Sequence, residues 1–155
     1  MSAALHLAAE SDLDRLQAMV AAYHRSENID KPDDHRRDAI LPLLQGSPHG
    51  AIWLIGPRRA PVGYIAISFG WSIELGGMDG FIDEFFIREN VRGRGMGTEV
   101  LATLLPQLAQ AGLKALHLKA PRENLGAQKL YAKQGFRLRD GYNLLTWLAD
   151  APRDA

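Results

Sequence analysis

Residues 81–112 constrain the fold of this chain more than any other part of the sequence. A short apolar run containing two acids, residues 81–87, is bounded by turn residues and predicts a buried strand. A loop follows in which glycine occupies every second position from 93 to 97. From Thr98 the apolar residues recur with a helical period until Gly112, which is suited to ending a helix. We therefore expect a strand, a glycine loop and a helix N-terminus in direct succession.

That succession is a geometry that binds phosphate. Unpaired backbone N–H groups converge at a helix N-terminus, and the helix dipole stabilises a nearby negative charge by about 0.3–1 kcal/mol. A Walker loop is excluded because no lysine follows the glycines. A dinucleotide fingerprint is excluded because Thr98 stands at its third glycine and residues 88–92 separate the loop from the strand. The remaining pattern is Arg92-x-x-Gly95-x-Gly97, for which an ordinary glycine turn is the alternative interpretation.

A second motif lies further along the chain. It reads Asn124-x-x-Ala127-x-x-Leu130-Tyr131-x-x-Gln134-Gly135-Phe136. Structure alone accounts for much of it, because Asn124 suits a helix N-cap and Gly135 suits the left-handed residue that ends a helix. By spacing alone, Tyr131 would be a core aromatic residue of an amphipathic helix.

The two motifs together resemble those of the GCN5-related N-acetyltransferases (the GNAT superfamily), over about residues 5–148. In that superfamily the Arg/Gln-x-x-Gly-x-Gly/Ala loop wraps the pyrophosphate of acetyl-CoA, so the resemblance implies acetyl-CoA as acyl donor. It also implies that the backbone of Phe86 or Ile87 stabilises the oxyanion, and that Tyr131 protonates the leaving thiolate. The residues implied to contact acetyl-CoA are Phe85, Phe86, Ile87, Arg92, Gly93, Arg94, Gly95, Met96, Gly97, Thr98, Asn124 and Tyr131.

Two adjacent acids, Asp83 and Glu84, interrupt the predicted central strand. Side chains alternate along a strand, so the two acids should point to opposite faces unless a bulge intervenes. Burying a charge costs several kcal/mol, so the pair requires a reason. Residues 83–87 and the loop resemble the diamine (spermidine/spermine) acetyltransferase branch, which implies Asp83 as base, directly or through water, and Glu84 as the group that binds the substrate ammonium. The structural alternative is an ion pair with a neighbouring arginine.

The resemblance also indicates where the acceptor would bind. It implies contacts at the end of the first helix, by Tyr23 and Glu27, and at the end of the third strand, by Trp71 and Glu74, in addition to Glu84. Trp71 could stack on a cation, but an ordinary core or surface tryptophan is the interpretation that its position favours. The histidines show no metal-ligand spacing, so we expect no metal site.

The composition narrows the classes of partner. Eighteen basic and eighteen acidic residues give a formal net charge of zero, which argues against binding to nucleic acid or to an anionic membrane. The sequence contains no cysteine and shows no secretory or membrane-spanning segment, so we expect a cytoplasmic location. We expect one domain over residues 1–155. Members of the superfamily are often homodimers, although nothing in the sequence specifies an interface.

The order of the elements predicts an α/β (α+β) fold of the GNAT type. We expect a mixed, mostly antiparallel sheet of about seven strands, with a splayed central parallel pair and helices on both faces. The last two strands, residues 136–139 and 142–147, are expected to form a closing hairpin around Asp140-Gly141. Residues 149–155 are expected to form a loose tail.

The predicted function is acetyl transfer from acetyl-CoA to the primary amine of a small molecule. Polyamines and diamines rank first, with amino acids and aminoglycosides also compatible. One alternative is an enzyme that acetylates a protein N-terminus or lysine. The other is a non-catalytic acyl-CoA-binding regulatory domain, against which the acids and Tyr131 argue.

Overall fold

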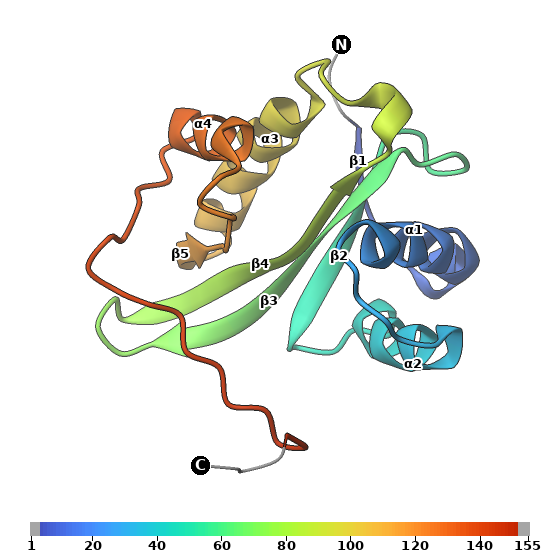
Figure 1. Ribbon diagram of the computed structural model, residues 1–155, viewed down its shortest axis with the longest axis horizontal. Coiled ribbons are helices and arrows are strands. Elements are labelled where there is room, and N and C mark those ends of the chain that lie inside the picture. The colour runs from blue at the N-terminus through green and yellow to red at the C-terminus, as the bar shows by residue number, and fades with distance from the viewer. Residues whose placement is uncertain (1–3, 152–155) are drawn as a thin grey trace.

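The computed structural model describes residues 4–151, which contain a five-stranded sheet in the order β1-β2-β3-β4-β5 (Figure 1). β1 to β4 are antiparallel neighbours, and β5 runs parallel to β4. The predicted class, a mixed and mostly antiparallel α/β sheet, is confirmed, whereas the predicted number of about seven strands is wrong. The strands are β1 (Leu5–Leu7), β2 (Gly50–Ile55), β3 (Gly63–Ser72), β4 (Gly77–Ile87) and β5 (Leu113–His117).

Helices cover both faces of the sheet. α1 and α2 pack on one face and α3 and α4 lie on the other (Figure 1). The alternation of side chains along β2 and β3 supplies both cores: Leu54 and Tyr64 join the cluster under α1, and Ile55 and Ile65 join the cluster under α3. The helical elements are η1 (Glu10–Asp12), α1 (Leu13–Ser26), α2 (Asp33–Leu44), η2 (Glu89–Val91), α3 (Met96–Gln110) and α4 (Leu125–Lys133).

A β-bulge lies at the acidic pair of β4. Ala66 of β3 is opposite Glu84, while the next residue, Ile67, is opposite Ile82, so Asp83 has no counterpart on β3. A bulge leaves one residue unpaired and re-aims the side chains beside it. The strict alternation that would send the two acids to opposite faces is therefore interrupted at this point.

The expected central parallel pair, β4 and β5, lies at one edge of the sheet in residues 4–151, and its two strands separate along their length. β5 pairs with β4 only over Met78–Phe81, and within the described chain residues 82–87 of β4 have no β5 partner. The backbone of β4 is therefore open on that side, at the end that leads into the glycine loop.

The predicted closing hairpin does not form. Asp140 and Gly141 occupy a turn in which the Tyr142 N–H donates to the Arg139 carbonyl at 3.3 Å, but neither flanking segment is a strand. Instead, residues 136–151 run as an extended segment away from α4 (Figure 1). Local turn chemistry determines the turn, whereas pairing with a sheet edge requires non-local contacts that the turn does not specify. Of the predicted loose tail, residues 152–155 lie outside the described chain.

Candidate active site

A cleft of about 420 Å³ opens where the end of β4 meets α1, α3 and α4. It combines segments that are far apart in the sequence, because the C-terminal end of α1 and one face of α4 meet across the end of the sheet. Eight of its ten lining residues were predicted from the sequence, and Ser26 and Leu130 were not. The residues that line it are Tyr23, Ser26, Glu27, Phe85, Phe86, Ile87, Arg92, Gly97, Leu130 and Tyr131.

The backbone N–H groups of the glycine loop have no hydrogen-bond acceptor within residues 4–151. Gly93 and Gly95 have φ angles of 78° and 76°, in the left-handed region that favours glycine, and Gly95 is the N-cap residue of α3. In residues 4–151, no N–H group from position 93 to position 98 donates to another protein group. A Cβ atom added at Gly93 or Gly95 would meet no atom within 4 Å, so the space beside these amides is free. The loop therefore fits an anionic group such as the diphosphate of acetyl-CoA.

At Gly97 the constraint is close packing and not backbone conformation. A Cβ atom there would lie 3.2 Å from Cδ2 of Leu130, because α4 packs closely against the first turn of α3. The third glycine of the loop thus brings α4, and with it Tyr131, next to the loop.

Arg92 is turned toward the end of β4. Its Nε donates to the Ile87 carbonyl at 2.7 Å, and its guanidinium lies 5.7 Å from the centre of the Phe86 ring. A cation over an aromatic face is attracted by the ring quadrupole. Arg92 therefore joins the loop to the strand that precedes it.

The backbone at the end of β4 has one side paired and one side open. The Arg88 N–H donates to the Val62 carbonyl at 2.7 Å, in the direction of β3. Hydrogen-bonding directions alternate along an antiparallel strand, so the Phe86 N–H also faces β3 and the Ile87 N–H faces the gap beside β5. Of the two predicted oxyanion donors, this alternation favours Ile87.

Tyr131 extends from α4 to the cleft. Its ring packs against Phe136 with centroids 5.5 Å apart, and burial raises the pKa of its phenol above the usual value of 10.0. The phenol therefore stays protonated at neutral pH, which is the state that a proton donor requires.

Glu84 is held by two side chains under α1. The Tyr64 hydroxyl donates to Oε1 of Glu84 at 2.7 Å, and Nε2 of His24 lies 2.7 Å from Oε2. Nε of Arg36 donates to Nδ1 of His24 at 3.1 Å, so in the neutral ring the proton is on Nε2 and points to Glu84. Burial, and then the charge of Glu84, raise the pKa of Tyr64 well above its usual range. Both carboxylate oxygens of Glu84 are therefore fixed in direction.

Sequence reasoning missed His24, Arg36 and Tyr64. One signal was available, because His24 follows Val20 by four residues and so falls on the buried stripe of α1. A titratable residue on such a stripe needs a partner. The partner on β4 could be identified only in the folded chain.

Tyr23 lies where several negative charges converge. Its pKa is raised to about 12 by burial, and further by the charges of Glu27, Glu84 and Asp83. Its ring packs against Tyr64 and Phe86, with centroids 6.4 and 6.1 Å away. The acids therefore make this end of the cleft attractive to a cation, although neither Asp83 nor Glu84 lines the cleft itself.

Other predicted residues lie outside the cleft. Asp83 is exposed on the bulge, and Asn124 uses Oδ1 to accept the Ala127 N–H at 3.0 Å as the N-cap of α4. Trp71 is seven residues beyond Tyr64 on β3, a span of about 23 Å at the usual rise per residue. It is 74% exposed at the far end of the strand, with Glu74 in the turn that follows.

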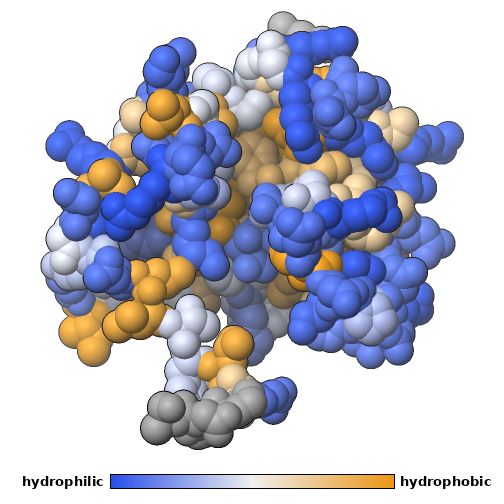
Figure 2. All heavy atoms as spheres, viewed as in Figure 1, coloured by the Kyte–Doolittle hydropathy of each residue, from blue (hydrophilic) through white to orange (hydrophobic). Residues whose placement is uncertain are grey.

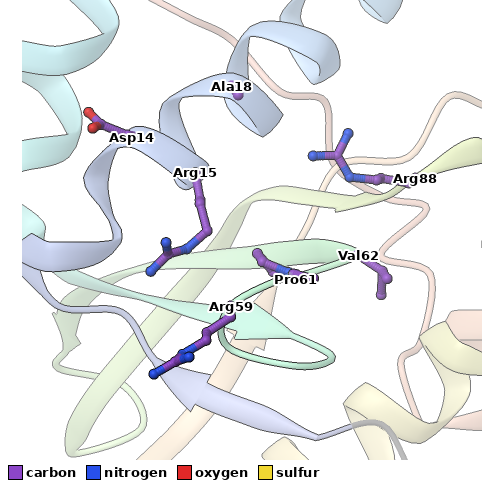
Figure 3. Close-up of a pocket in the computed structure, with 8 residues that line it drawn as sticks. Asp14, Arg15, Ala18, Arg59, Pro61, Val62 and Arg88 are labelled. Carbon is purple, nitrogen blue, oxygen red and sulfur yellow. The ribbon is translucent and has the colours of Figure 1, made fainter.

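A second, more basic hollow of about 560 Å³ lies between the start of α1, the β2–β3 loop and the residue that follows β4. Figure 3 shows that Arg15, Arg59 and Arg88 reach it from these three segments. None of the residues predicted for the site lines it. The remaining lining residues are Asp14, Ala18, Ala60, Pro61 and Val62.

Two features are absent from residues 4–151. No helix there has both the length and the apolar character needed to cross a bilayer. The same residues contain no cluster of three or more His, Cys, Asp or Glu side chains that could hold a metal ion.

Comparison with solved structures supports the fold. An integron cassette protein from the mobile metagenome of Cole Harbour Salt Marsh is 30% identical, with a TM-score of 0.82 over 96% of this chain and 91% of that chain. A possible acetyltransferase from Clostridium difficile 630 is 17% identical, with a TM-score of 0.76 over 96% and 99% of the two chains. The aminoglycoside acetyltransferase AAC(6')-Iy, solved with the bisubstrate analogue CoA-S-monomethyl-acetylneamine, is 15% identical, with a TM-score of 0.76 over 97% and 100%.

The sequence comparisons identify the family. No curated protein gives a significant match to this sequence. The family model described as the acetyltransferase (GNAT) family, however, matches residues 3–136, which contain the glycine loop, the acidic pair and Tyr131. The chain therefore belongs to the GNAT family of acetyltransferases.

Proposed function

We propose that this protein transfers the acetyl group of acetyl-CoA to the primary amine of a small, cationic acceptor, with diamines and polyamines as the first candidates. The observation that carries the proposal is the cleft at the end of β4, where the loop, Tyr131 and Tyr23 with its surrounding acids meet. The N–H groups of the loop, which have no protein acceptor in residues 4–151, would hold the diphosphate. Acetyl-CoA supplies an activated thioester.

The residues around the cleft can support each step of the transfer. The amine must be neutral to attack, and Asp83, exposed on the bulge, can take its proton directly or through water. As the amine nitrogen bonds to the carbonyl carbon, negative charge develops on the oxygen, where the Ile87 N–H can donate. The carbon–sulfur bond then breaks, and the Tyr131 phenol can protonate the departing thiolate. The attacking nitrogen loses its second proton through water, which restores the phenol and leaves a neutral amide and a CoA thiol.

Glu84 has a separate role in this proposal. Because His24 and Tyr64 hold both of its oxygens, its charge stays in one place and can attract the acceptor's ammonium toward the cleft. Glu27, which lines the cleft, adds a second negative charge on the acceptor side. Two separated carboxylates favour an acceptor with more than one positive charge.

A substrate panel tests the proposal by measuring release of free CoA thiol from acetyl-CoA. The panel contains diamines, polyamines, aminoglycosides, amino acids and a peptide with a free N-terminus. Each diamine is matched with an alkyl monoamine of the same chain length, so that only the second charge differs. We expect a diamine or polyamine to give the highest kcat/KM, at least about tenfold above its matched monoamine.

Three outcomes would contradict the proposal. Equal kcat/KM for the diamine and its monoamine would remove the argument from the acids. Turnover confined to the peptide would indicate a protein acetyltransferase. Binding of acetyl-CoA in calorimetry, without thiol release on any amine, would indicate a regulatory domain.

A further inference from the structure

The basic hollow beside the start of α1 has no part in the proposed acetyl transfer. It shares no lining residue with the cleft at the end of β4, although the two are neighbours: Ile87 lines the cleft, and the next residue, Arg88, lines the hollow. Figure 2 shows hydrophilic side chains gathered over η2 and the β2–β3 loop, at the upper right of the molecule. The hollow, of about 560 Å³, falls within the usual range of small-molecule sites, about 300–1,000 Å³. It therefore has room for a small organic ligand.

Positive charge dominates the lining of this hollow. Arg15, Arg59 and Arg88 reach it from three segments (Figure 3), and Asp14 is the one acid in that lining. In residues 4–151, the guanidinium groups of Arg59 and Arg88 have no hydrogen-bond acceptor and no ion-pair partner. A guanidinium keeps its charge in proteins and carries five N–H donors. The hollow therefore presents two sets of donors that the protein itself does not use.

The third arginine, Arg15, is held in place by a buried acid. Its Nη2 donates to Oδ1 of Asp12 at 3.2 Å. Oδ2 of Asp12 accepts from Nη2 of Arg58 at 3.0 Å and from the Ala9 N–H at 2.8 Å. Asp12 has an exposed fraction of 0%, so its hydrogen bonds fix the position of the Arg15 guanidinium. Two arginines share this one carboxylate, so positive charge remains beside the hollow.

The surface between the arginines is apolar and its backbone is fixed. In Figure 3, Pro61 lies among the three arginine side chains. The Val62 N–H donates to the Ile55 carbonyl at 2.8 Å, and the Val62 carbonyl accepts the Arg88 N–H at 2.7 Å. A site that is arranged before binding loses less conformational entropy when a ligand enters. The apolar residues of the lining are Ala18, Ala60, Pro61 and Val62.

We propose that this hollow binds a small phosphate monoester with a flat apolar part, at a site distinct from the acetyl-CoA cleft. A phosphate monoester carries a charge of about −1.5 to −2 at neutral pH and three strong acceptor oxygens. Guanidinium forks bind such oxygens in pairs, and they also stack on flat rings. The phosphate contacts the arginines, and the flat part packs on the apolar surface around Pro61.

Calorimetry with adenosine 5′-monophosphate as the test ligand examines this site directly. Adenosine and inorganic phosphate are the matched halves of the ligand, and each should bind at least about tenfold more weakly than the whole. Gly95→Val, which changes the glycine loop, should leave the affinity for adenosine monophosphate within about twofold of wild type. Absence of binding to the wild type would overturn the proposal. So would inorganic phosphate that binds as tightly as the monophosphate, or loss of binding in Gly95→Val, which would place the ligand at the loop.

Two arginine variants separate this hollow from the general charge of the surface. Arg59→Gln/Arg88→Gln should weaken binding of adenosine monophosphate at least about tenfold, because it removes the two guanidinium groups that have no protein partner in residues 4–151. Arg37→Gln/Arg139→Gln is the matched control, since it removes two positive charges from exposed positions outside the hollow. The control should stay within about twofold of wild type. Equal affinity in the two double variants would contradict the assignment.

A second pair of variants leaves every arginine in place. Ala18→Glu adds a carboxylate to the lining of the hollow from an exposed position of α1, where glutamate suits a helix. It should weaken binding of adenosine monophosphate at least about tenfold through repulsion of the phosphate. Ala102→Glu, at an exposed position of α3, is the control and should leave the affinity unchanged. If Ala18→Glu binds as tightly as Ala102→Glu, the ligand does not occupy the hollow.

Discussion

The Glu84 network under α1 and the glycine loop after β4 differ in how their polar groups are satisfied. Under α1, Glu84 accepts hydrogen bonds from Tyr64 and His24, so the protein itself completes that network. At the glycine loop, the amides from position 93 to position 98 have no protein acceptor in residues 4–151. In the proposed function, the Glu84 network belongs to the side that receives the amine and is arranged before any ligand binds, whereas the loop amides, on the acetyl-CoA side, would gain their hydrogen-bond acceptors from acetyl-CoA. Substitutions on the two sides should therefore fail in different ways.

The largest effect is expected from Gly95→Val, which changes the glycine loop proposed to bind acetyl-CoA. Valine is strained at a φ of 76°, and its side chain would occupy the space beside the loop amides. Affinity for acetyl-CoA, measured by calorimetry, should fall more than about 100-fold. Gly46→Val is the matched control, because Gly46 also has positive φ and open space but lies between α2 and β2. Equal affinity in the two variants would contradict the assignment of the loop.

Glu84→Gln acts on the acceptor side and removes a charge with little change of shape. We expect kcat/KM for the amine to fall about 100-fold, with acetyl-CoA affinity within about twofold of wild type. Glu89→Gln, in the exposed η2, is the control for loss of one negative charge near the strand end. A fall in acetyl-CoA affinity as large as the fall in kcat/KM would show that Glu84 affects acetyl-CoA binding as well as the acceptor amine.

Tyr131→Phe tests the phenol that is proposed to protonate the CoA thiolate, between the acetyl-CoA side and the acceptor-amine side of the cleft. Removal of the phenol should lower kcat about 10- to 100-fold through loss of the proton donor, with acetyl-CoA affinity near wild type. Tyr142→Phe, in the exposed C-terminal segment, should leave kcat unchanged. Single-turnover kinetics check the result, and an unchanged rate in Tyr131→Phe would exclude its role as acid.

His24→Ala should have a smaller effect, because His24 acts on the acceptor only through Glu84. Loss of its hydrogen bond leaves Tyr64 as the one remaining donor to that carboxylate, so kcat/KM should fall about 3- to 10-fold. The double variant His24→Ala/Glu84→Gln provides the check. If the two effects simply multiply, His24 does not act through Glu84.

Tyr23→Phe should have the smallest effect, visible in stability at high pH. The pKa of Tyr23 is raised to about 12 in the folded protein, so the native state retains a proton that the unfolded state loses above about pH 10. The stabilisation from the neutral phenol is complete below that pH and is lost as pH rises toward 12. Denaturant unfolding from pH 9 to 12 should show a shallower decline in Tyr23→Phe, by up to about one proton. An identical decline would contradict the burial of this phenol.

The sequence predicted the local geometry of the glycine loop better than the positions of the residues expected to contact the acceptor. The glycines at 93 and 95 lie at positive φ beside the start of α3, as a phosphate loop requires, because strand, loop and helix are neighbours in the chain. Tyr131 was placed through a motif whose residues lie within one helix and its ends. On the acceptor side, Tyr23 and Glu27 line the cleft, whereas Trp71 lies at the far end of β3. The distance of Trp71 from the cleft depends on the register between β3 and β4, which no local sequence pattern specifies.

The order and type of most elements, the glycine loop and the cap of α4 follow from the sequence, because periodicity, glycine conformations and caps act over a few residues. The tertiary structure alone decided three features: the bulge that leaves Asp83 without a counterpart, the contacts of His24 and Tyr64 with Glu84, and the path of the chain after Phe136. Each depends on contacts between residues far apart in the chain. The C-terminal segment is the clearest case, since Asp140-Gly141 specifies a turn but not the sheet that its flanking arms join.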